Sequence, residues 1–188
     1  ALLYGAVYDS FAIALIIGLM FLGAAVGVGA FSKGETLSKV GLPVLGMAMT
    51  GLMIHVAHGR SEAHFAVFAF LACLVVYRSP IPVIAGAAAI AVHHLTFNQF
   101  QAWGWGPICF TEPSFMRVVE HAVYVIVESV VLILLALRAA ADFTSAEELM
   151  EIADQIQSAD GTLDLTVAHI EAQGRASRKL VEALRHIE

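Results

Sequence analysis

Long runs of apolar residues, separated by short polar segments, dominate the chain up to about residue 140. A membrane-spanning α-helix needs about 20 mostly apolar residues, and five runs reach or approach that length. They comprise residues 10–32, 40–57, 63–77, 80–97 and 116–138. The pattern predicts an all-α fold: a polytopic transmembrane helix bundle with about five spans.

The pattern changes after residue 140 to that of amphipathic helices. Leu149, Ile152 and Ile156 recur at spacings of three and four, which predicts one apolar stripe on a helix. The stripe is interrupted at residues 160–166 and resumes over residues 176–187. Two such helices can bury their stripes in a parallel four-helix bundle formed by two chains. A solvated amphipathic tail is the alternative.

Composition and charge support this division. The chain is 59% hydrophobic and 14% charged, whereas a soluble domain is about 25% charged. Acidic and basic residues balance within residues 1–140, so residues 141–188 carry the whole net charge of −6. We therefore predict a membrane domain, residues 1–140, followed by a short soluble acidic tail, residues 141–188. The absence of a basic patch excludes nucleic-acid binding, and the apolar composition disfavours a soluble enzyme.

The distribution of basic residues predicts the orientation of the spans. If the spans alternate, four basic residues lie on one side of the membrane and two on the other. The larger group is Lys33, Lys39, Arg78 and Arg138, and the smaller is Arg60 and Arg117. Because the positive side is usually cytoplasmic, we expect the C-terminal tail in the cytoplasm and the first residue outside.

With this topology, six of the eight histidines fall at the outer ends of the spans, together with several carboxylates. Neutral imidazole and carboxylate are the usual ligands of zinc, copper and iron. The candidate metal ligands are His55, His58, Glu62, His64, His93, His94, His121 and Glu128. His64, His121 and one of the pair His93/His94 come from three different spans and can converge. Adjacent helical residues point about 100° apart, so only one of that pair readily faces the interior.

Glu128 is a candidate for a different reason. It lies near the middle of the last apolar run, on the same helix face as Arg117, His121 and Tyr124. An ionised carboxylate at that depth costs at least a few kcal/mol. Glu128 must therefore be protonated, be paired or face a polar cavity.

Two kinds of bound group remain open. A metal ion is favoured, with copper or zinc the preferred identity. The alternative is haem b, for which the small residues 85–89 and Phe65, Phe68 and Phe70 can form a pocket. The candidate cofactor-binding residues are His55, His64, His94 and His121.

Three motifs together resemble a known sensory module. They are GRxExHFxxF at residues 59–68, the pair His93-His94, and EHAxxVxxE at residues 120–128. The region 47–132 resembles the multi-span N-terminal sensor region of bacterial chemoreceptors (methyl-accepting chemotaxis proteins) and of some hybrid sensor histidine kinases. Residues 156–166 and 177–188 resemble a HAMP-type linker, although the proline usual after the last span is absent.

The resemblance implies a homodimeric, multi-pass receptor of the bacterial inner membrane that is not itself an enzyme. Its partners would be membrane lipid, a second copy, and a cytoplasmic signalling module with its kinase or adaptor. The rival interpretation is a membrane-bound redox metalloprotein or enzyme that uses the same histidines. A transporter is less favoured, because Gly and Pro lie mostly at the ends of the spans.

Overall fold

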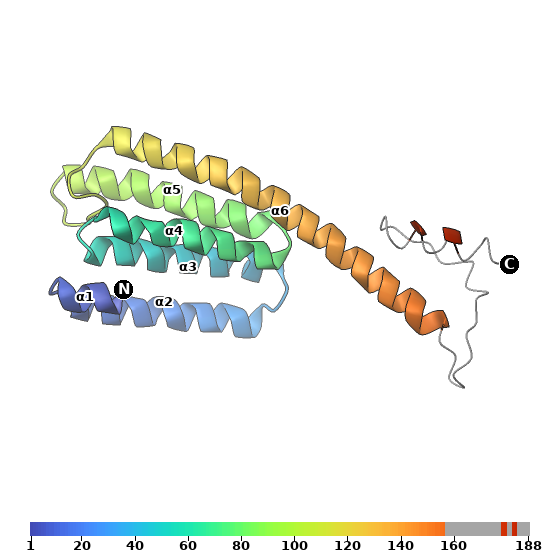
Figure 1. Cartoon of the computed structure of the whole chain (residues 1–188). Helices are drawn as coiled ribbons and strands as arrows, with labels where there is room; N and C mark the ends of the chain where they lie inside the picture. Colours follow the sequence, from blue (N-terminus) through green and yellow to red (C-terminus); the bar gives the residue numbers. More distant parts are fainter. Residues whose placement is uncertain (157–177, 180–181, 184–188) are drawn as a thin grey trace. The chain divides into compact units, whose positions relative to one another are not determined.

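The computed structural model describes residues 1–156, 178–179 and 182–183, and every regular element in this part is a helix. In chain order these are α1 (Leu2–Val7), α2 (Phe11–Phe31), α3 (Thr36–Val56), α4 (Ser61–Cys73), the 3₁₀ helix η1 (Leu74–Tyr77), α5 (Pro80–Ala102) and α6 (Phe115–Ile156) (Figure 1). The predicted all-α fold is confirmed. The chain divides into two compact units, residues 1–136 and 137–188.

Four helices, α2, α3, α5 and α6, are long and apolar enough to cross a membrane. They correspond to four of the five predicted spans and indicate a membrane protein. The third predicted span, residues 63–77, lies within the shorter apolar segment Ser61–Tyr77, formed by α4 and η1. It stops there because Arg78 adopts a left-handed conformation (φ 51°) and Pro80 begins α5, so the chain turns instead of extending the helix.

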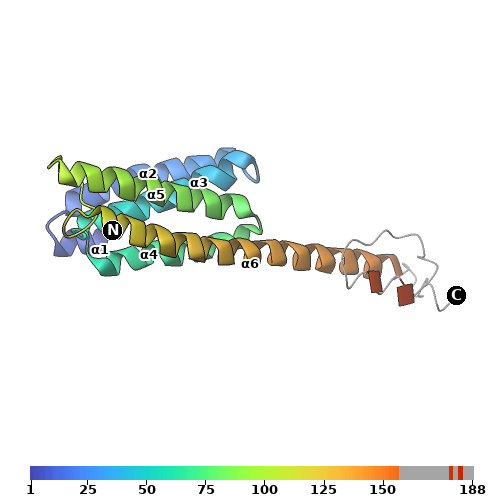
Figure 2. The ribbon, with the colours of Figure 1, turned by 90° about the horizontal axis from the view of Figure 1, so that it is seen from above.

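Helix α3 lies at the centre of the first unit, where it packs against α2, α4 and α5 (Figures 1 and 2). The main core includes Met47 from α3, Leu71 from α4, Ile90 from α5 and Leu132 from α6. At Gly86 of α5, an added Cβ would lie 2.9 Å from Leu74 and 3.2 Å from Leu71. Small residues at such points let helices approach closely, which is a main source of association between membrane helices.

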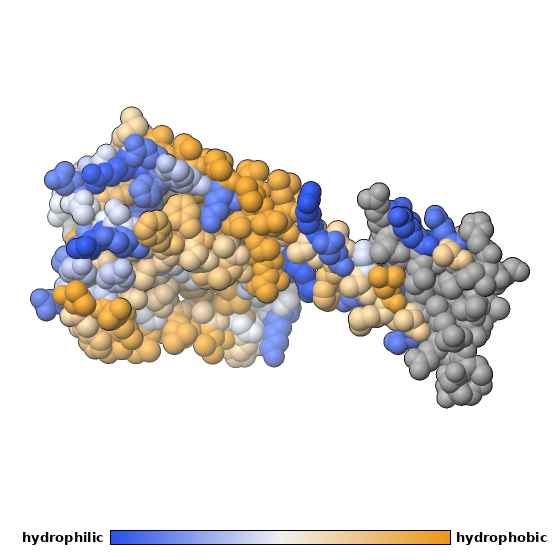
Figure 3. Space-filling view, in the orientation of Figure 1, coloured by the Kyte–Doolittle hydropathy of each residue, from blue (hydrophilic) through white to orange (hydrophobic). Residues whose placement is uncertain are grey.

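The turn between α3 and α4 and the loop between α5 and α6 lie at the same end of the bundle (Figure 1). Hydrophilic side chains gather over this end of α4, α5 and α6, whereas apolar side chains cover the flank of α6 (Figure 3). The six histidines outside the tail belong to the helix segments and turns nearest this end. The fold therefore concentrates the histidines of the first unit in one region.

The tail is described only in part. Residues 147–156, where the first amphipathic helix was expected, are helical and continue α6 without a break. The predicted connector, residues 160–166, lies outside the described residues. So does most of the second predicted helix, residues 176–187, of which residues 178–179 and 182–183 are described and helical.

Candidate metal centre

Three helices bring three histidine rings together at the loop end of the bundle. His64 lies in the first turn of α4, His94 in the second half of α5, and His121 in the second turn of α6. The ring centroids are 5.5 Å apart for His64 and His94, 5.1 Å for His64 and His121, and 5.4 Å for His94 and His121. Of the adjacent pair His93/His94, it is thus His94 that joins His64 and His121.

All three rings make the same hydrogen bond to the backbone. Each Nδ1 donates to the carbonyl oxygen four residues earlier, at 2.9 Å for His64, 2.9 Å for His94 and 2.8 Å for His121. Because a carbonyl only accepts, the proton is on Nδ1, and Nε2 of the neutral ring carries a free lone pair. Histidines that bind metals usually donate their other N–H to a carbonyl or carboxylate in this way.

The free Nε2 atoms of His64 and His94 are buried. Neither makes a hydrogen bond within the described part of the chain. Leaving a buried polar atom without a partner costs about 1–3 kcal/mol, so two such atoms side by side need an explanation. A bound cation would provide a partner for both lone pairs.

Cys109 supplies a third donor, which the sequence analysis missed. Its side chain is fully buried, and its Sγ lies with one ring nitrogen each of His64 and His94 in a group whose atoms are all within 4.8 Å of one another. Burial raises the pKa of the Cys109 thiol to about 12. The sulfur is therefore a protonated thiol unless a cation lies beside it.

Phe110 covers the three histidines. Its ring centroid is 5.4 Å from that of His64, with nearly parallel planes (3°), and 5.6 Å and 5.1 Å from those of His94 and His121. The ring excludes water from the centre of the group. The three imidazoles and the phenyl ring of Phe110 are thus in mutual contact.

Gln101 of α5 holds Cys109 and Phe110 in place. Its Nε2 donates to the carbonyl oxygen of Phe110 at 2.6 Å, and its Oε1 accepts from the N–H of Cys109 at 2.9 Å and of Phe110 at 3.2 Å. The same backbone passes close to Gly59 (φ 70°), where an added Cβ would lie 2.6 Å from the carbonyl oxygen of Phe110. The α5–α6 loop is therefore fixed from two sides.

His55 also fixes this loop and does not join the three-histidine group. Its Nδ1 accepts a hydrogen bond of 3.0 Å from the N–H of Ile108. The neutral ring must then carry its proton on Nε2, so neither nitrogen offers a lone pair while this bond persists. Further along the loop, the buried side chain of Asn98 accepts from the N–H of Ser114 at 2.7 Å.

Two other histidines proposed as ligands point elsewhere. His93 packs on Phe97, with ring centroids 4.1 Å apart, and lies against Gly51. His58 is exposed in the α3–α4 turn, where its ring lies 5.4 Å from that of Tyr8.

The two carboxylates proposed as ligands are also outside the group. Glu62 is exposed and forms an ion pair of 3.5 Å with Arg60. Glu128 follows His121 by seven residues, a rise of about 10 Å along α6. Its Oε2 is buried and makes no hydrogen bond within the described part of the chain. Tyr124, between them in sequence, is 67% exposed.

The chain was compared with protein-family models, with curated proteins and with solved structures, and none of the three comparisons found a match. These comparisons therefore assign the chain to no family.

The contact at Gly59 predicts how the loop can be displaced. In a Cys73→Ser background, Cys109 is the one remaining cysteine, and its burial predicts slow reaction with a maleimide. Gly59→Ala should accelerate this reaction by about tenfold or more, because the new methyl group pushes the Phe110 backbone away. Gly104→Ala is the matched control: Gly104 also has a positive φ (74°), but nothing lies near its Cβ position. Equal rates in the two variants would contradict the loop packing.

Proposed function

We propose that this chain is the transmembrane sensory region of a bacterial chemoreceptor, which binds a metal ion and relays its state to a cytoplasmic output module. The observation that carries the proposal is the convergence of His64, His94 and Cys109 beside His121. These donors come from α4, α5, the α5–α6 loop and α6.

The donor set fits copper or zinc. Imidazole and thiolate together are typical of both ions. With a metal–nitrogen distance of about 2.0 Å, two imidazoles bound at tetrahedral angles have ring centroids about 5 Å apart. The separations of 5.1–5.5 Å among the three histidines are close to that value. We propose His64, His94 and Cys109 as the primary ligands and His121 as the fourth.

His121 connects the ion to the helix that would transmit the signal. It lies in the second turn of α6, and α6 continues as one helix to Ile156. Binding an ion, or changing its oxidation state, would pull on His121 and bias the position of α6. Helix shifts of about 1–2 Å are sufficient for known switches. From the positive-inside bias of the spans, we propose that this site lies on the periplasmic side of the inner membrane. The resemblance to chemoreceptor sensor regions supports a homodimer.

Metal binding can be tested on the purified chain with Co²⁺ and Zn²⁺. We expect one ion per chain and a near-ultraviolet charge-transfer band between thiolate and cobalt. Cys109→Ser should remove the band, and His64→Ala or His94→Ala should lower the affinity by about a hundredfold or more. His93→Ala is the matched control, because it removes the adjacent imidazole outside the group. A cobalt complex without the thiolate band, or an equal loss in His93→Ala, would refute the site.

The relay can be tested separately with a spin label at the exposed position Ala153 of α6, introduced as Ala153→Cys in a Cys73→Ser background. We expect dipolar coupling between two copies in membranes, because the receptor is proposed to be a dimer. Adding diamagnetic Zn²⁺ should shift the distance distribution by about 1–2 Å or more, and His64→Ala should abolish this shift. If no dipolar coupling is observed, the proposed dimer is contradicted. If coupling is observed but Zn²⁺ leaves the distance distribution unchanged, the proposed relay is contradicted.

A further inference from the structure

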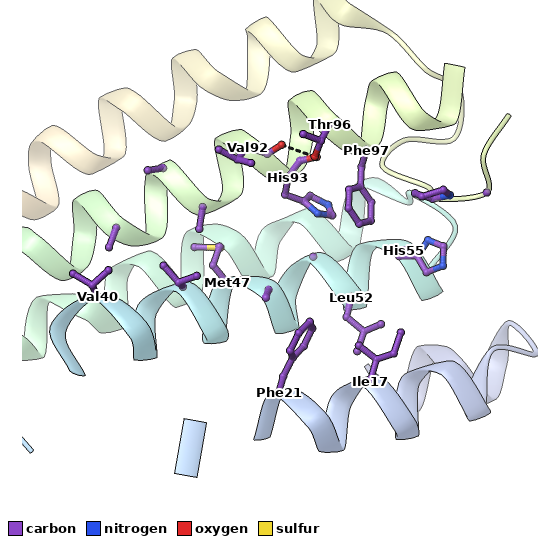
Figure 4. Close-up of a pocket in the computed structure, with 18 of the residues that line it drawn as sticks. Ile17, Phe21, Val40, Met47, Leu52, His55, Val92, His93, Thr96 and Phe97 are labelled. Carbon is purple, nitrogen blue, oxygen red and sulfur yellow. Dashed lines mark hydrogen bonds between the residues drawn. The ribbon is translucent and has the colours of Figure 1, made fainter. Parts of the chain in front are cut away.

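A cavity of about 900 Å³ lies between α2, α3 and α5, outside the metal centre. Figure 4 shows Phe21 and Ile17 of α2, Met47 and Leu52 of α3, and His93 of α5 around it. The loop residues 105–107 line it at the end of the bundle that carries the metal centre. Small residues create the space, because Gly51, Ala85, Ala88 and Ala89 are among those that face it.

The polar groups of this cavity are few and uncharged. None of its lining residues is Lys, Arg, Asp or Glu. His55 offers an N–H at Nε2, because its Nδ1 already accepts from Ile108. His93 also lines the cavity, and its Nε2 is buried and makes no hydrogen bond within the described part of the chain. A fitting ligand therefore has an uncharged, hydrogen-bonding oxygen at this end.

Aromatic rings accompany these two histidines. Phe97 packs on the His93 ring at 4.1 Å, and Trp105 lines the cavity from the loop. Flat aromatic surfaces favour stacking with a planar head group. Beyond the histidines, the wall is formed by aliphatic residues such as Val40, Val44 and Met47, which match an apolar tail.

We propose that this cavity binds a membrane-soluble quinone, with a carbonyl oxygen near His55 and His93 and its tail along α3. A fatty acid fits less well, since no cationic side chain is present to neutralise its carboxylate. The same argument disfavours a phospholipid head group. The proposal does not depend on the metal ion, although His55 connects the two sites by holding Ile108 next to Cys109.

Quinone binding can be measured through Trp105. In a Trp103→Phe background, Trp105 is the one remaining tryptophan of the chain, and a quinone bound beside it quenches its fluorescence. We expect decylubiquinone to quench the chain in lipid nanodiscs saturably. Ala89→Phe fills the cavity and should weaken binding by about tenfold or more. Palmitate should not displace the quinone.

Ala91→Phe is the matched control, because Ala91 faces a different groove, between α5 and α6. Ala91→Phe should leave quinone binding unchanged. Ala89→Phe should leave Co²⁺ binding unchanged, and this second result distinguishes a failure of the quinone proposal from a failure of the metal site. If Ala89→Phe does not fold, Ala85→Leu alters the same wall. Three results would overturn the proposal: quenching that does not saturate, an equal loss of quenching in Ala89→Phe and Ala91→Phe, or reversal of the quenching by palmitate.

Discussion

The first unit depends on how it accommodates imidazoles between membrane helices. A buried ring must satisfy both nitrogens, and the backbone can serve only one of them through the carbonyl four residues earlier. His64, His94 and His121 all use that bond, which leaves Nε2 to find a partner across the helix interface. The buried, unpartnered nitrogens of His64 and His94 are the reason why we propose a shared ligand between α4 and α5, and the Cys109 sulfur beside them favours a metal ion.

The loop between α5 and α6 is as important as the helices. Without Gln101, His55 and Asn98, its backbone N–H groups would lack these partners, and Cys109 would not be held against the histidines. Three side chains that bind no metal thus preorganise the residue that we propose as a ligand. The same loop lines the cavity between α2, α3 and α5 through Trp105 and Pro107, so the proposed metal site and the proposed quinone site share one structural element.

Hydrophobic runs predicted the helices well, because membrane spans are set by length and apolarity. The length of the helix over residues 63–77 was harder to predict, because the turn at Arg78 ends an apolar run that otherwise resembles a span. The position of histidines at the ends of runs indicated which helices would meet, but helix phase decided between His93 and His94. The role of Cys109 could not be predicted, because its position depends on hydrogen bonds that its backbone and that of Phe110 make with the Gln101 side chain. No local sequence pattern indicates such bonds. His55 and Glu62 were predicted as ligands because their side chains are suitable for a metal. In the structure, His55 accepts a hydrogen bond from the backbone of Ile108, and Glu62 pairs with Arg60 at the surface.

The central claim is that two imidazoles and one thiolate bind the same ion. X-ray absorption of the zinc-loaded chain tests it directly, because sulfur and nitrogen ligands differ in distance and scattering. The account predicts one sulfur at about 2.3 Å together with imidazole nitrogens at about 2.0 Å. A zinc shell of oxygen and nitrogen alone, without sulfur, would contradict it.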